Sequence, residues 1–433
     1  MKKNYVLYAV LGCMAILNIL SCNDIVYPDS LAVKPGEVVS NEFTHYEPLA
    51  LTSVNATLSS DYMRGVDASE VKALEECGIK FYDSDNTEKD VFAIFANHGV
   101  NWVRLRIWND YTVAMDSTYG NLGSDYWAPY GWNNLSRTIA MAKRAKAHGL
   151  KVLLDFHYSD TWADPAKQFL PKMWNNYKDN PEALSEAVAS YTKEIVLAMK
   201  EADCAPDMIQ LGNESEGGLF KKDYLGNQLS LSHSDGAACL VEAAKVIREL
   251  LPKCKIMLHM SAGGDANRLA SFFNNYVNKM VDGETKLCDA VGLSYYPFYS
   301  SHKTLDELVT NCETIKAKGY EPVIAEISYA YSTTAWSDST GNIFSNQQAT
   351  AGNSISSLAD STGKIDATIE NQALVVREVL EKTAAAGSTG IFYWGTCYLG
   401  VDDIMASAYE NQALFDVQGK VLPSMDVFAV QGN

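Results

Sequence analysis

Eight short apolar runs alternate with helix-like stretches between residues 63 and 398, and this alternation most constrains what the chain can fold into. Each run has the length and the content of branched and aromatic side chains that are typical of a buried strand. The predicted strands are 63–69, 102–108, 151–159, 208–215, 255–261, 290–298, 322–330 and 390–398.

The segments between these strands have the spacing of amphipathic helices. They are 88–99, 135–149, 181–202, 234–252, 266–280, 304–319 and 371–387. Four of them end on a glycine where a helix C-terminus favours one, namely Gly99, Gly149, Gly319 and Gly387. The pattern predicts an α/β fold, a (β/α)8 TIM barrel with enlarged βα loops. A doubly wound open sheet is the alternative, but no glycine-rich phosphate loop follows the first strand.

Length and charge narrow the class of protein. The chain has 433 residues, 47% of them hydrophobic, which fits one barrel-sized domain or two to three smaller ones. Its formal net charge of -18 argues against nucleic acid as a partner, because proteins that bind nucleic acid usually gather basic side chains on one face.

The N-terminus is typical of a targeting signal. Lys2 and Lys3 precede an apolar run, 6–20, that is short for a membrane span. Ser21 directly before Cys22 resembles a bacterial lipoprotein box, so 1–21 is predicted to be a lipoprotein signal peptide and Cys22 the lipid anchor. An ordinary cleaved signal peptide is the alternative. No second apolar span follows, so membrane contact is expected through the lipid alone, with two or more acyl chains for firm anchoring.

Residues 22–58 have no clear period and are interpreted as a linker or small embellishment, which leaves 59–433 as the barrel domain. Acidic residues soon after Cys22 favour the outer membrane and cell surface of a Gram-negative bacterium. Seven cysteines remain beyond Cys22, without zinc-type spacing, and read as buried apolar side chains with room for one disulfide. A monomer is expected because a barrel needs no partner to close its sheet.

Two glutamates end apolar strands. Glu214 follows "IQLGN" at the fourth strand, and Glu326 lies in "VIAEIS" at the seventh. Strand ends meet at the catalytic face of a barrel, and a carboxylate pair there is the equipment of a glycosidase, with one acid/base and one nucleophile. A lone glutamate at a strand end is more often a surface or salt-bridged group; two such positions favour the catalytic interpretation.

Other strand ends carry candidate binding residues. Arg104 and Arg106 share one face of the second strand, where a guanidinium can hold a carboxylate and keep it ionised. His157 after the third strand could donate to a sugar hydroxyl or to the nucleophile, or could be a hydrogen-bonded core histidine. The remaining candidates are a tyrosine that would place a hydroxyl near the nucleophile, a tryptophan floor for one sugar ring, and two residues just past the third strand: Tyr295, Trp394, Trp162 and Asp164.

These motifs together resemble glycoside hydrolase family 53, the arabinogalactan endo-β-1,4-galactanases, a retaining clan A family with a (β/α)8 fold. The matching stretches include "VRLRIW", "LDFHYSDTWADP", "IQLGNE", "SYYPF" and "AEISYAY", and they span about residues 63 to 416. The resemblance implies Glu214 as acid/base and Glu326 as nucleophile. It also implies that Asn213 binds the 2-hydroxyl of the sugar under attack.

The resemblance also raises the question of a metal, since some bacterial members similar to this chain hold calcium after the seventh strand. That long segment, from Tyr331 to about Asp366, is predicted to be structureless. It offers Asp338 and Asn342 but no histidine, a thin set for an ion that takes six to eight oxygens. No cofactor is required for the implied chemistry, and a structural calcium is a candidate only. Trp336 nearby is a sugar platform or a loop anchor.

The implied function is retaining endo-hydrolysis of β-1,4-galactosidic bonds in pectic galactan or type I arabinogalactan. Retention predicts carboxyl groups about 5–5.5 Å apart. Two alternatives stay open: a clan-related enzyme acting on xylan, mannan or β-glucan, and a non-catalytic glycan-binding lipoprotein at the cell surface.

Overall fold

The structure, a computed structural model, describes residues 43–51, 58–109, 133–333, 347–399 and 409–429. The chain separates into two compact units, Met1–Pro35 and Gly36–Asn433, and only the second contains described residues. The predicted signal peptide, Cys22 and most of the predicted linker lie outside the described residues. No helix in the described part of the chain is long and apolar enough to cross a membrane.

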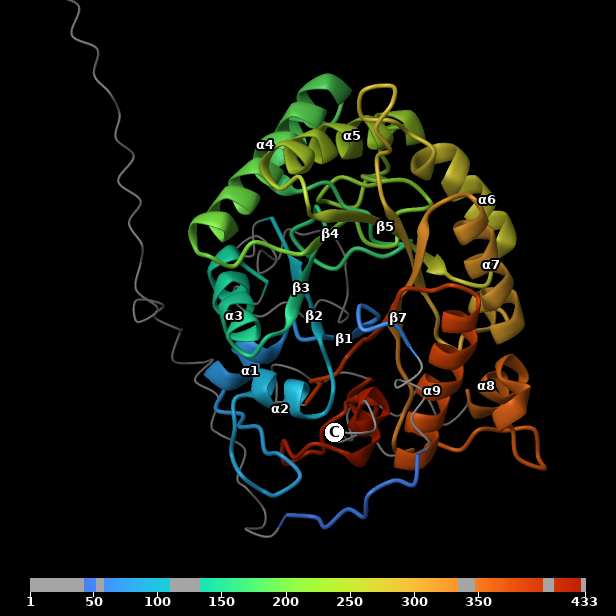
Figure 1. Cartoon of the computed structure of the whole chain (residues 1–433). Helices are drawn as coiled ribbons and strands as arrows, with labels where there is room; N and C mark the ends of the chain where they lie inside the picture. The colour runs from blue at the N-terminus through green and yellow to red at the C-terminus, as the bar shows by residue number, and fades with distance from the viewer. Residues whose placement is uncertain (1–42, 52–57, 110–132, 334–346, 400–408, 430–433) are drawn as a thin grey trace, which may run out of the picture. The chain divides into compact units, whose positions relative to one another are not determined.

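Eight parallel strands close into a barrel, in which each strand pairs with the next along the chain and β8 pairs with β1 (Figure 1). This closed order confirms the predicted (β/α)8 barrel and excludes the open sheet. The strands are β1 (Met63–Asp67), β2 (Trp102–Ile107), β3 (Lys151–Phe156), β4 (Met208–Leu211), β5 (Lys255–Ala262), β6 (Ala290–Ser294), β7 (Glu321–Ile327) and β8 (Gly390–Tyr393).

Helices surround the strands and alternate with them along the chain (Figure 1). They are α1 (Val71–Glu76), α2 (Val91–Asn97), α3 (Leu135–Ala147), α4 (Pro181–Glu201), α5 (His233–Leu250), α6 (Ala266–Phe272), α7 (Leu305–Ala317), α8 (Gln348–Ser354) and α9 (Ile369–Ala385). A π-helical turn, Phe273–Val277, extends α6. Short 3₁₀ turns occupy Lys172–Tyr177, Ser300–His302, Ser356–Leu358, Glu410–Gln412 and Pro423–Phe428.

The barrel interior has an apolar floor with a polar layer above it. All eight strands contribute to the floor, which consists of Met63, Trp102, Leu153, Met208, Met257, Ala290, Val323, Ala325 and Phe392. Because side chains two positions apart on a strand share a face, a step of two from the floor leads to Arg104, Asp155, Gln210, His259 and Trp394. This step places polar side chains toward the carboxyl ends of the strands, where barrel active sites lie.

Several predicted boundaries were wrong, for local reasons. The fourth strand ends at Leu211 because Gly212 (φ +78°) and Glu214 (φ +46°) adopt left-handed backbone, which no strand continues. The predicted structureless segment after β7 contains α8, whose seven residues are too short and too rich in small polar side chains to show a helical period. The helix α1 was not predicted. The four helix-ending glycines do have positive φ, as expected.

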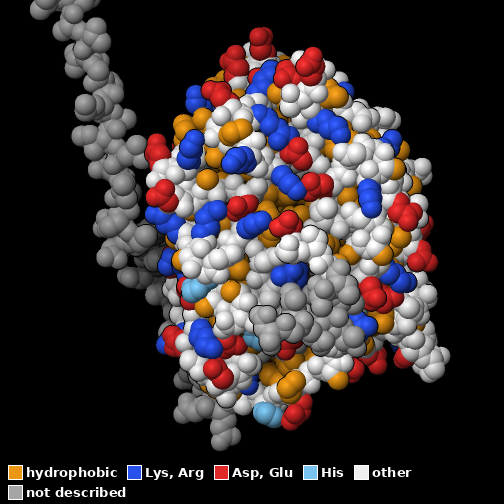
Figure 2. All heavy atoms as spheres, in the orientation of Figure 1, with side chains coloured by type: hydrophobic (Ala, Val, Ile, Leu, Met, Phe, Trp, Pro, Cys, Tyr) orange, Lys and Arg blue, Asp and Glu red, His pale blue; other side chains and the backbone are white. Residues whose placement is uncertain are grey.

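All seven cysteines among the described residues are free thiols, so the disulfide left open by the sequence does not form. On the face drawn in Figure 2, Lys and Arg side chains are interspersed with Asp and Glu side chains and form no continuous basic patch among the described residues.

A buried histidine joins the C-terminal segment to α2. Nδ1 of His98 lies 2.6 Å from Asp426 Oδ1, and Nε2 lies 2.9 Å from Asp83 Oδ1. These carboxylates outweigh the effect of burial and raise the pKa of His98, whereas hydrogen bonds from Lys89, His98 and Asn97 hold the pKa of Asp83 below its usual range despite its burial. The end of helix α2 adds a further preference for a cation at this position.

We expect His98→Gln to lower the melting temperature most between about pH 4 and pH 6.5. Because the pKa of His98 is raised in the folded protein, its contribution to stability is complete below the unfolded pKa and is lost as the pH rises through the folded pKa. The pKa of Asp83 is lowered, so its contribution is lost as the pH falls through the folded pKa of that carboxyl group. The cost should be about 1.5–3 kcal/mol, the range for a hydrogen bond to a charged group. Thermal unfolding at several pH values measures it, with His148→Gln as the control. An equal loss at pH 5 and pH 9 would contradict this expectation.

Candidate active site

Glu214 lies just past the end of β4, on a backbone that only tertiary structure can hold. Its φ of +46° is rare for a residue with a side chain. The conformation aims the carboxyl group across the barrel, where Ser294 Oγ at the end of β6 lies 2.6 Å from Glu214 Oε1. The side chain is partly exposed, so a ligand at the mouth of the barrel can reach it.

Glu326 lies on β7 and is more deeply buried, at 5% exposure. Arg104 Nη1 lies 2.8 Å from Glu326 Oε1, and the Tyr296 hydroxyl donates to Glu326 Oε2 at 2.7 Å. Both carboxylate oxygens are therefore held by donors. This fixes the orientation of the group and leaves it acceptor-only.

Ser294 links the two glutamates and limits their separation. Its Oγ is 2.6 Å from Glu214 Oε1 and 3.4 Å from Glu326 Oε2. The two carboxylate oxygens are thus at most about 6 Å apart, which fits the ~5–5.5 Å separation of retaining glycosidases better than the wider gap that an inverting enzyme needs for a water.

The electrostatic environments of the two glutamates differ. Burial and the negative charge of Glu326 raise the pKa of Glu214 well above its usual range. Burial also raises the pKa of Glu326, but the Arg104 guanidinium and the Tyr296 hydroxyl oppose that rise. Of the two, Glu326 contacts the cation, so Glu326 ionises first and Glu214 keeps its proton. Unequal carboxyl groups of this kind separate an acid from a nucleophile.

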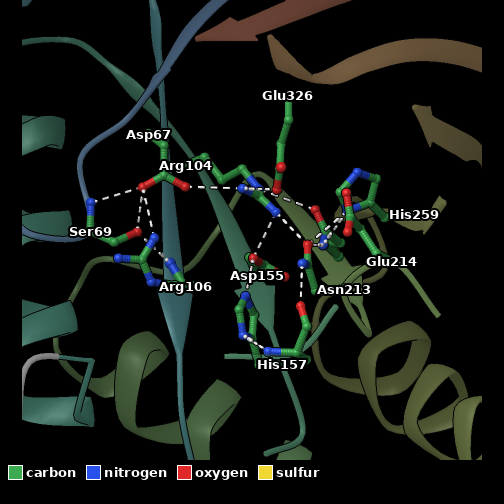
Figure 3. A network of polar contacts seen from close by, with 12 residues as sticks. Asp67, Ser69, Arg104, Arg106, Asp155, His157, Asn213, Glu214, His259 and Glu326 are labelled. Atoms are coloured by element: carbon green, nitrogen blue, oxygen red, sulfur yellow. Dashed lines mark hydrogen bonds and ion pairs between the residues drawn. The ribbon is translucent and has the colours of Figure 1, made fainter. Parts of the chain in front are cut away.

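Arg104 is the centre of the polar layer (Figure 3). Besides Glu326, its guanidinium contacts Asp67 at 3.0 Å, Asp155 at 2.8 Å and the Asn213 side chain at 2.8 Å. It holds the Glu326 carboxylate, which is the role that the sequence allows for a guanidinium on this strand, and contact with substrate stays a prediction. At 1% exposure its donors are used within the protein.

Arg106 is equally buried, and its contact with substrate stays a prediction. It pairs with Glu70 and Asp67, and its guanidinium carbon lies 4.0 Å from the centre of the Trp162 ring. This cation–π contact supports Trp162 from beneath. Arg106 thus contacts the site through the Trp162 ring.

His157 has the contacts of the core histidine that the sequence left as an alternative, and its role in substrate binding stays a prediction. Its Nε2 lies 3.2 Å from Asp155. Its Nδ1 accepts from the Trp108 indole at 3.2 Å and from the Ala163 backbone at 3.1 Å. With both ring nitrogens used and 2% exposure, no hydrogen-bonding capacity faces the barrel mouth.

The tyrosine whose hydroxyl lies beside Glu326 is Tyr296, and not Tyr295 as the sequence predicted. Tyr295 points outward, where its phenol lies near Asp306 and Glu307 of α7, and its hydroxyl finds no hydrogen-bond partner among the described residues. The alternation of side chains decides this, because Ser294 pairs with Glu326 across the sheet and Tyr296 shares its face.

The other predicted binding residues line the mouth. Asn213 is held by Arg104 and donates through Nδ2 to the Ala163 carbonyl at 2.8 Å, which leaves one amide hydrogen for a ligand. Trp394 and Trp162 are partly exposed, with ring centres 6.3 Å apart. Asp164 is partly exposed and accepts from the Ala166 backbone at 2.8 Å, at the edge of the same loop.

The candidate calcium ligands, Asp338 and Asn342, lie in 334–346 with Trp336, outside the described residues. Within the residues that are described, no group of three or more His, Cys, Asp or Glu side chains is arranged to hold a metal ion. The chemistry of the carboxyl pair uses only groups of the protein itself.

Comparison with known families then decides the class of protein. The sequence profile described as glycosyl hydrolase family 53 matches residues 63–428, which is most of the chain and includes both glutamates. The chain belongs to glycosyl hydrolase family 53. It is therefore a glycoside hydrolase, and the predicted family is confirmed.

Similar family 53 proteins cover nearly the same length. An endo-beta-1,4-galactanase of Bacillus subtilis is 31% identical over 408 residues, 86% of each chain. An arabinogalactan endo-beta-1,4-galactanase of Thermothelomyces thermophilus is 32% identical over 372 residues, 84% of this chain and 98% of that one. A solved catalytic domain of the family from Ignisphaera aggregans has a TM-score of 0.74 and 32% identity, and the match covers 89% of this chain and 100% of that one.

Three polar residues of this family 53 site were not predicted: Ser294, His259 and Tyr296. Each lies on or just past β5 or β6, in a run that is mostly apolar and reads as an ordinary strand. Tyr296 could have been found by counting two residues on from Ser294 on the inward face. For His259 the signal was its place two residues after the floor residue Met257, which needs the floor to be known first.

We expect Tyr296→Phe to lower kcat about 10- to 100-fold, because it removes a hydrogen bond to a charged group, worth about 1.5–3 kcal/mol. The loss should also raise the pKa of Glu326, so that the acidic limb of the kcat/KM profile moves to higher pH. Tyr295→Phe is the matched control, since its outward hydroxyl has no partner, and should leave both quantities unchanged. Equal effects of the two substitutions would contradict the assignment of Tyr296.

Proposed function

We propose that this family 53 enzyme performs retaining endo-hydrolysis of β-1,4-galactosidic linkages in pectic galactan and type I arabinogalactan. The observation that carries the chemistry is the carboxyl pair bridged by Ser294, with one member held by Arg104 and the other kept protonated. The assignment of the substrate is based on the relatives, whose names give endo-β-1,4-galactanase activity in a bacterium and in a fungus.

The first step transfers the galactosyl unit to the enzyme. Glu326 attacks the anomeric carbon, and the glycosidic bond breaks as Glu214 gives its proton to the leaving oxygen. Arg104 and Tyr296 aim the attacking carboxylate. The product of this step is a galactosyl ester of Glu326 and a shortened chain with a free 4-hydroxyl.

The second step releases the sugar with its original configuration. Glu214, now ionised, takes a proton from water, and the water oxygen attacks the anomeric carbon and displaces Glu326. The free hydrogen of the Asn213 amide is available to the 2-hydroxyl of the bound sugar in both steps. Trp394 offers an apolar face to the same ring. Asp164 and Trp162 stand where the polymer leaves the mouth.

A time course on debranched galactan, xylan and mannan tests the function. Protein lacking residues 1–22 should release mixed galacto-oligosaccharides early from galactan, sized by chromatography, and nothing from the other two polymers. The Glu214→Gln, Glu326→Gln double variant is the control. Galactose as the sole early product would overturn the endo mode, and activity on xylan or mannan alone would overturn the substrate. A folded protein without turnover would favour a binding role.

We also propose that the enzyme reaches its substrate as a lipid-anchored monomer at the cell envelope. The proposal rests on the sequence alone: 1–21 as signal peptide, Cys22 as the acylated residue, 22–58 as a linker and 59–433 as the catalytic domain. In cells fed labelled palmitate, the wild-type protein should take up label and partition with the outer membrane, whereas Cys22→Ala should do neither. Label on both proteins would refute the anchor.

A further inference from the structure

Polar contacts connect Glu214 through Ser294 and His259 to Asn213 in a chain. Ser294 and His259 have no role in the two steps described above. Ser294 Oγ lies 2.6 Å from Glu214 Oε1, and His259 Nε2 lies 2.9 Å from Ser294 Oγ. On the other side of the ring, His259 Nδ1 lies 2.8 Å from Asn213 Oδ1 (Figure 3). Both His259 and Ser294 are fully buried, so solvent cannot supply or remove hydrogens in this chain.

The neighbours of Asn213 fix which way its amide points. Arg104 can only donate, and it lies 2.8 Å from Asn213 Oδ1; the Ala163 carbonyl can only accept, and it lies 2.8 Å from Nδ2. The amide oxygen therefore faces His259. The Gln210 amide nitrogen also lies 3.1 Å from His259 Nδ1, but its two hydrogens go to the Gly212 carbonyl at 3.1 Å and to Asn213 Oδ1 at 3.0 Å. Because an amide oxygen cannot donate, the 2.8 Å contact with Asn213 places a hydrogen on His259 Nδ1.

The position of this hydrogen determines the rest of the chain. Burial and the nearby Arg104 charge lower the pKa of His259 well below its usual range, so the ring is neutral and Nε2 is bare. A bare Nε2 accepts, and Ser294 donates its single hydrogen to it. The contact between Ser294 and Glu214 then needs a hydrogen from Glu214.

We propose that His259 and Ser294 are a pair of positioning residues that hold the serine hydroxyl as an acceptor and thereby keep a proton on Glu214. The role of the pair rests on the proposed acid/base role of Glu214. When Glu214 loses its proton, Ser294 turns its hydrogen from His259 to the carboxylate, while the hydrogen of His259 stays on Nδ1. The bare Nε2 then faces the serine oxygen at 2.9 Å with no hydrogen between them, which is unfavourable. The pair thus favours the acid in the first step and strengthens the base in the second.

Other charged and titratable groups face these side chains. Those around Glu214 come from β7, from the loops after β3 and β4 and from the segment after β6: Glu326, Asp164, Glu216, Tyr296 and Tyr299. Those around His259 are Arg104, Asp155, His157 and His302. Removing the Ser294 hydroxyl leaves all of them in place, so a difference between wild type and Ser294→Ala reports on the pair.

Nitrogen NMR of the histidine rings tests the pair without any substrate. The His259 signals, assigned by their loss in His259→Gln, should show a neutral ring with hydrogen on Nδ1 in the resting wild-type enzyme. As Glu214 ionises, the hydrogen should stay on Nδ1, and the Nε2 signal should shift because that nitrogen loses the hydrogen bond from Ser294. A ring with hydrogen on Nε2 throughout, or a doubly protonated ring at neutral pH, would overturn the proposal. The result stands whether or not the enzyme cleaves galactan, so it is separable from the proposed function.

The pH profile of Ser294→Ala provides a second test whose sign is decisive. If Ser294 accepts from Glu214, removing it lowers the pKa of Glu214, and the alkaline limb of kcat/KM on galactan moves down by about one pH unit. If Ser294 merely donates to the carboxylate, the limb moves up; an upward shift or no shift overturns the proposal. Ser388→Ala is the matched control, because its buried hydroxyl bonds the Gly390 carbonyl at the opposite end of β8. A wild type with no turnover would refute the proposed function, while the NMR result still decides the role of the pair.

Discussion

Glu326→Ala is expected to lower kcat on galactan by about 10⁴-fold or more, because no covalent intermediate can form without this carboxylate. Its two oxygens are held by Arg104 and Tyr296, so no other carboxylate can take its place by a small shift. The variant should stay folded, since removing a carboxylate from a buried cluster also relieves its burial cost. Glu321→Ala, at the amino end of the same strand, is the matched control and should keep wild-type activity.

The reaction of the Glu326→Ala variant with azide tests the assignment of Glu326 as the nucleophile. In the cavity left by alanine, azide can attack the anomeric carbon of an activated aryl β-galactobioside from the face that Glu326 occupied. The product should be an α-galactosyl azide, with inverted configuration, because only one displacement occurs. Identification of the product by NMR checks this. A β-galactosyl azide from this variant would contradict the nucleophile assignment.

Glu214→Ala has the second largest expected effect, a fall of about 10²- to 10⁴-fold in kcat on galactan, the range for general acid–base catalysis. The effect should depend on the leaving group. A dinitrophenyl glycoside needs no proton on its departing oxygen, so its first step should be nearly normal, and an initial burst of dinitrophenol should precede slow release of the sugar. Equal losses on galactan and on the activated substrate would contradict the acid role.

Azide should give the opposite stereochemistry with the Glu214→Ala variant. With Glu326 intact and Glu214 removed, the galactosyl ester forms and azide attacks it from the other face. The product should be a β-galactosyl azide, with retained configuration. The two alanine variants thus yield opposite anomers from one substrate, and this contrast assigns the two roles independently of how far each rate falls.

The barrel was predictable because each strand is buried on both faces and reads as a continuous apolar run. The ends of the strands were not. Glu214 at φ +46° and Tyr158 at φ +50° leave the extended conformation while the local sequence still resembles a strand. These ends are held by contacts across the barrel, such as that between Glu214 and Ser294, which no local pattern contains.

Within the site, the sequence identified groups whose chemistry is unusual for a strand end. Glu214 and Glu326 stood out because carboxylates rarely follow apolar runs. Arg104 and His157 stood out in the same way, but sequence could not show that neighbours use all their hydrogen bonds. The choice between two adjacent tyrosines depended on the pairing of Ser294 with Glu326, a feature of the sheet rather than of either strand.

Proton NMR of the reaction on galactan tests at once whether galactan is the substrate and whether the carboxyl pair cleaves it with retention. Signals of reducing-end galactose units recorded in the first minutes should show the β anomer alone, with the α anomer growing only as mutarotation proceeds. Initial release of the α anomer would contradict the double displacement through Glu326 and Glu214. No new reducing ends at all would contradict the assignment of galactan as substrate.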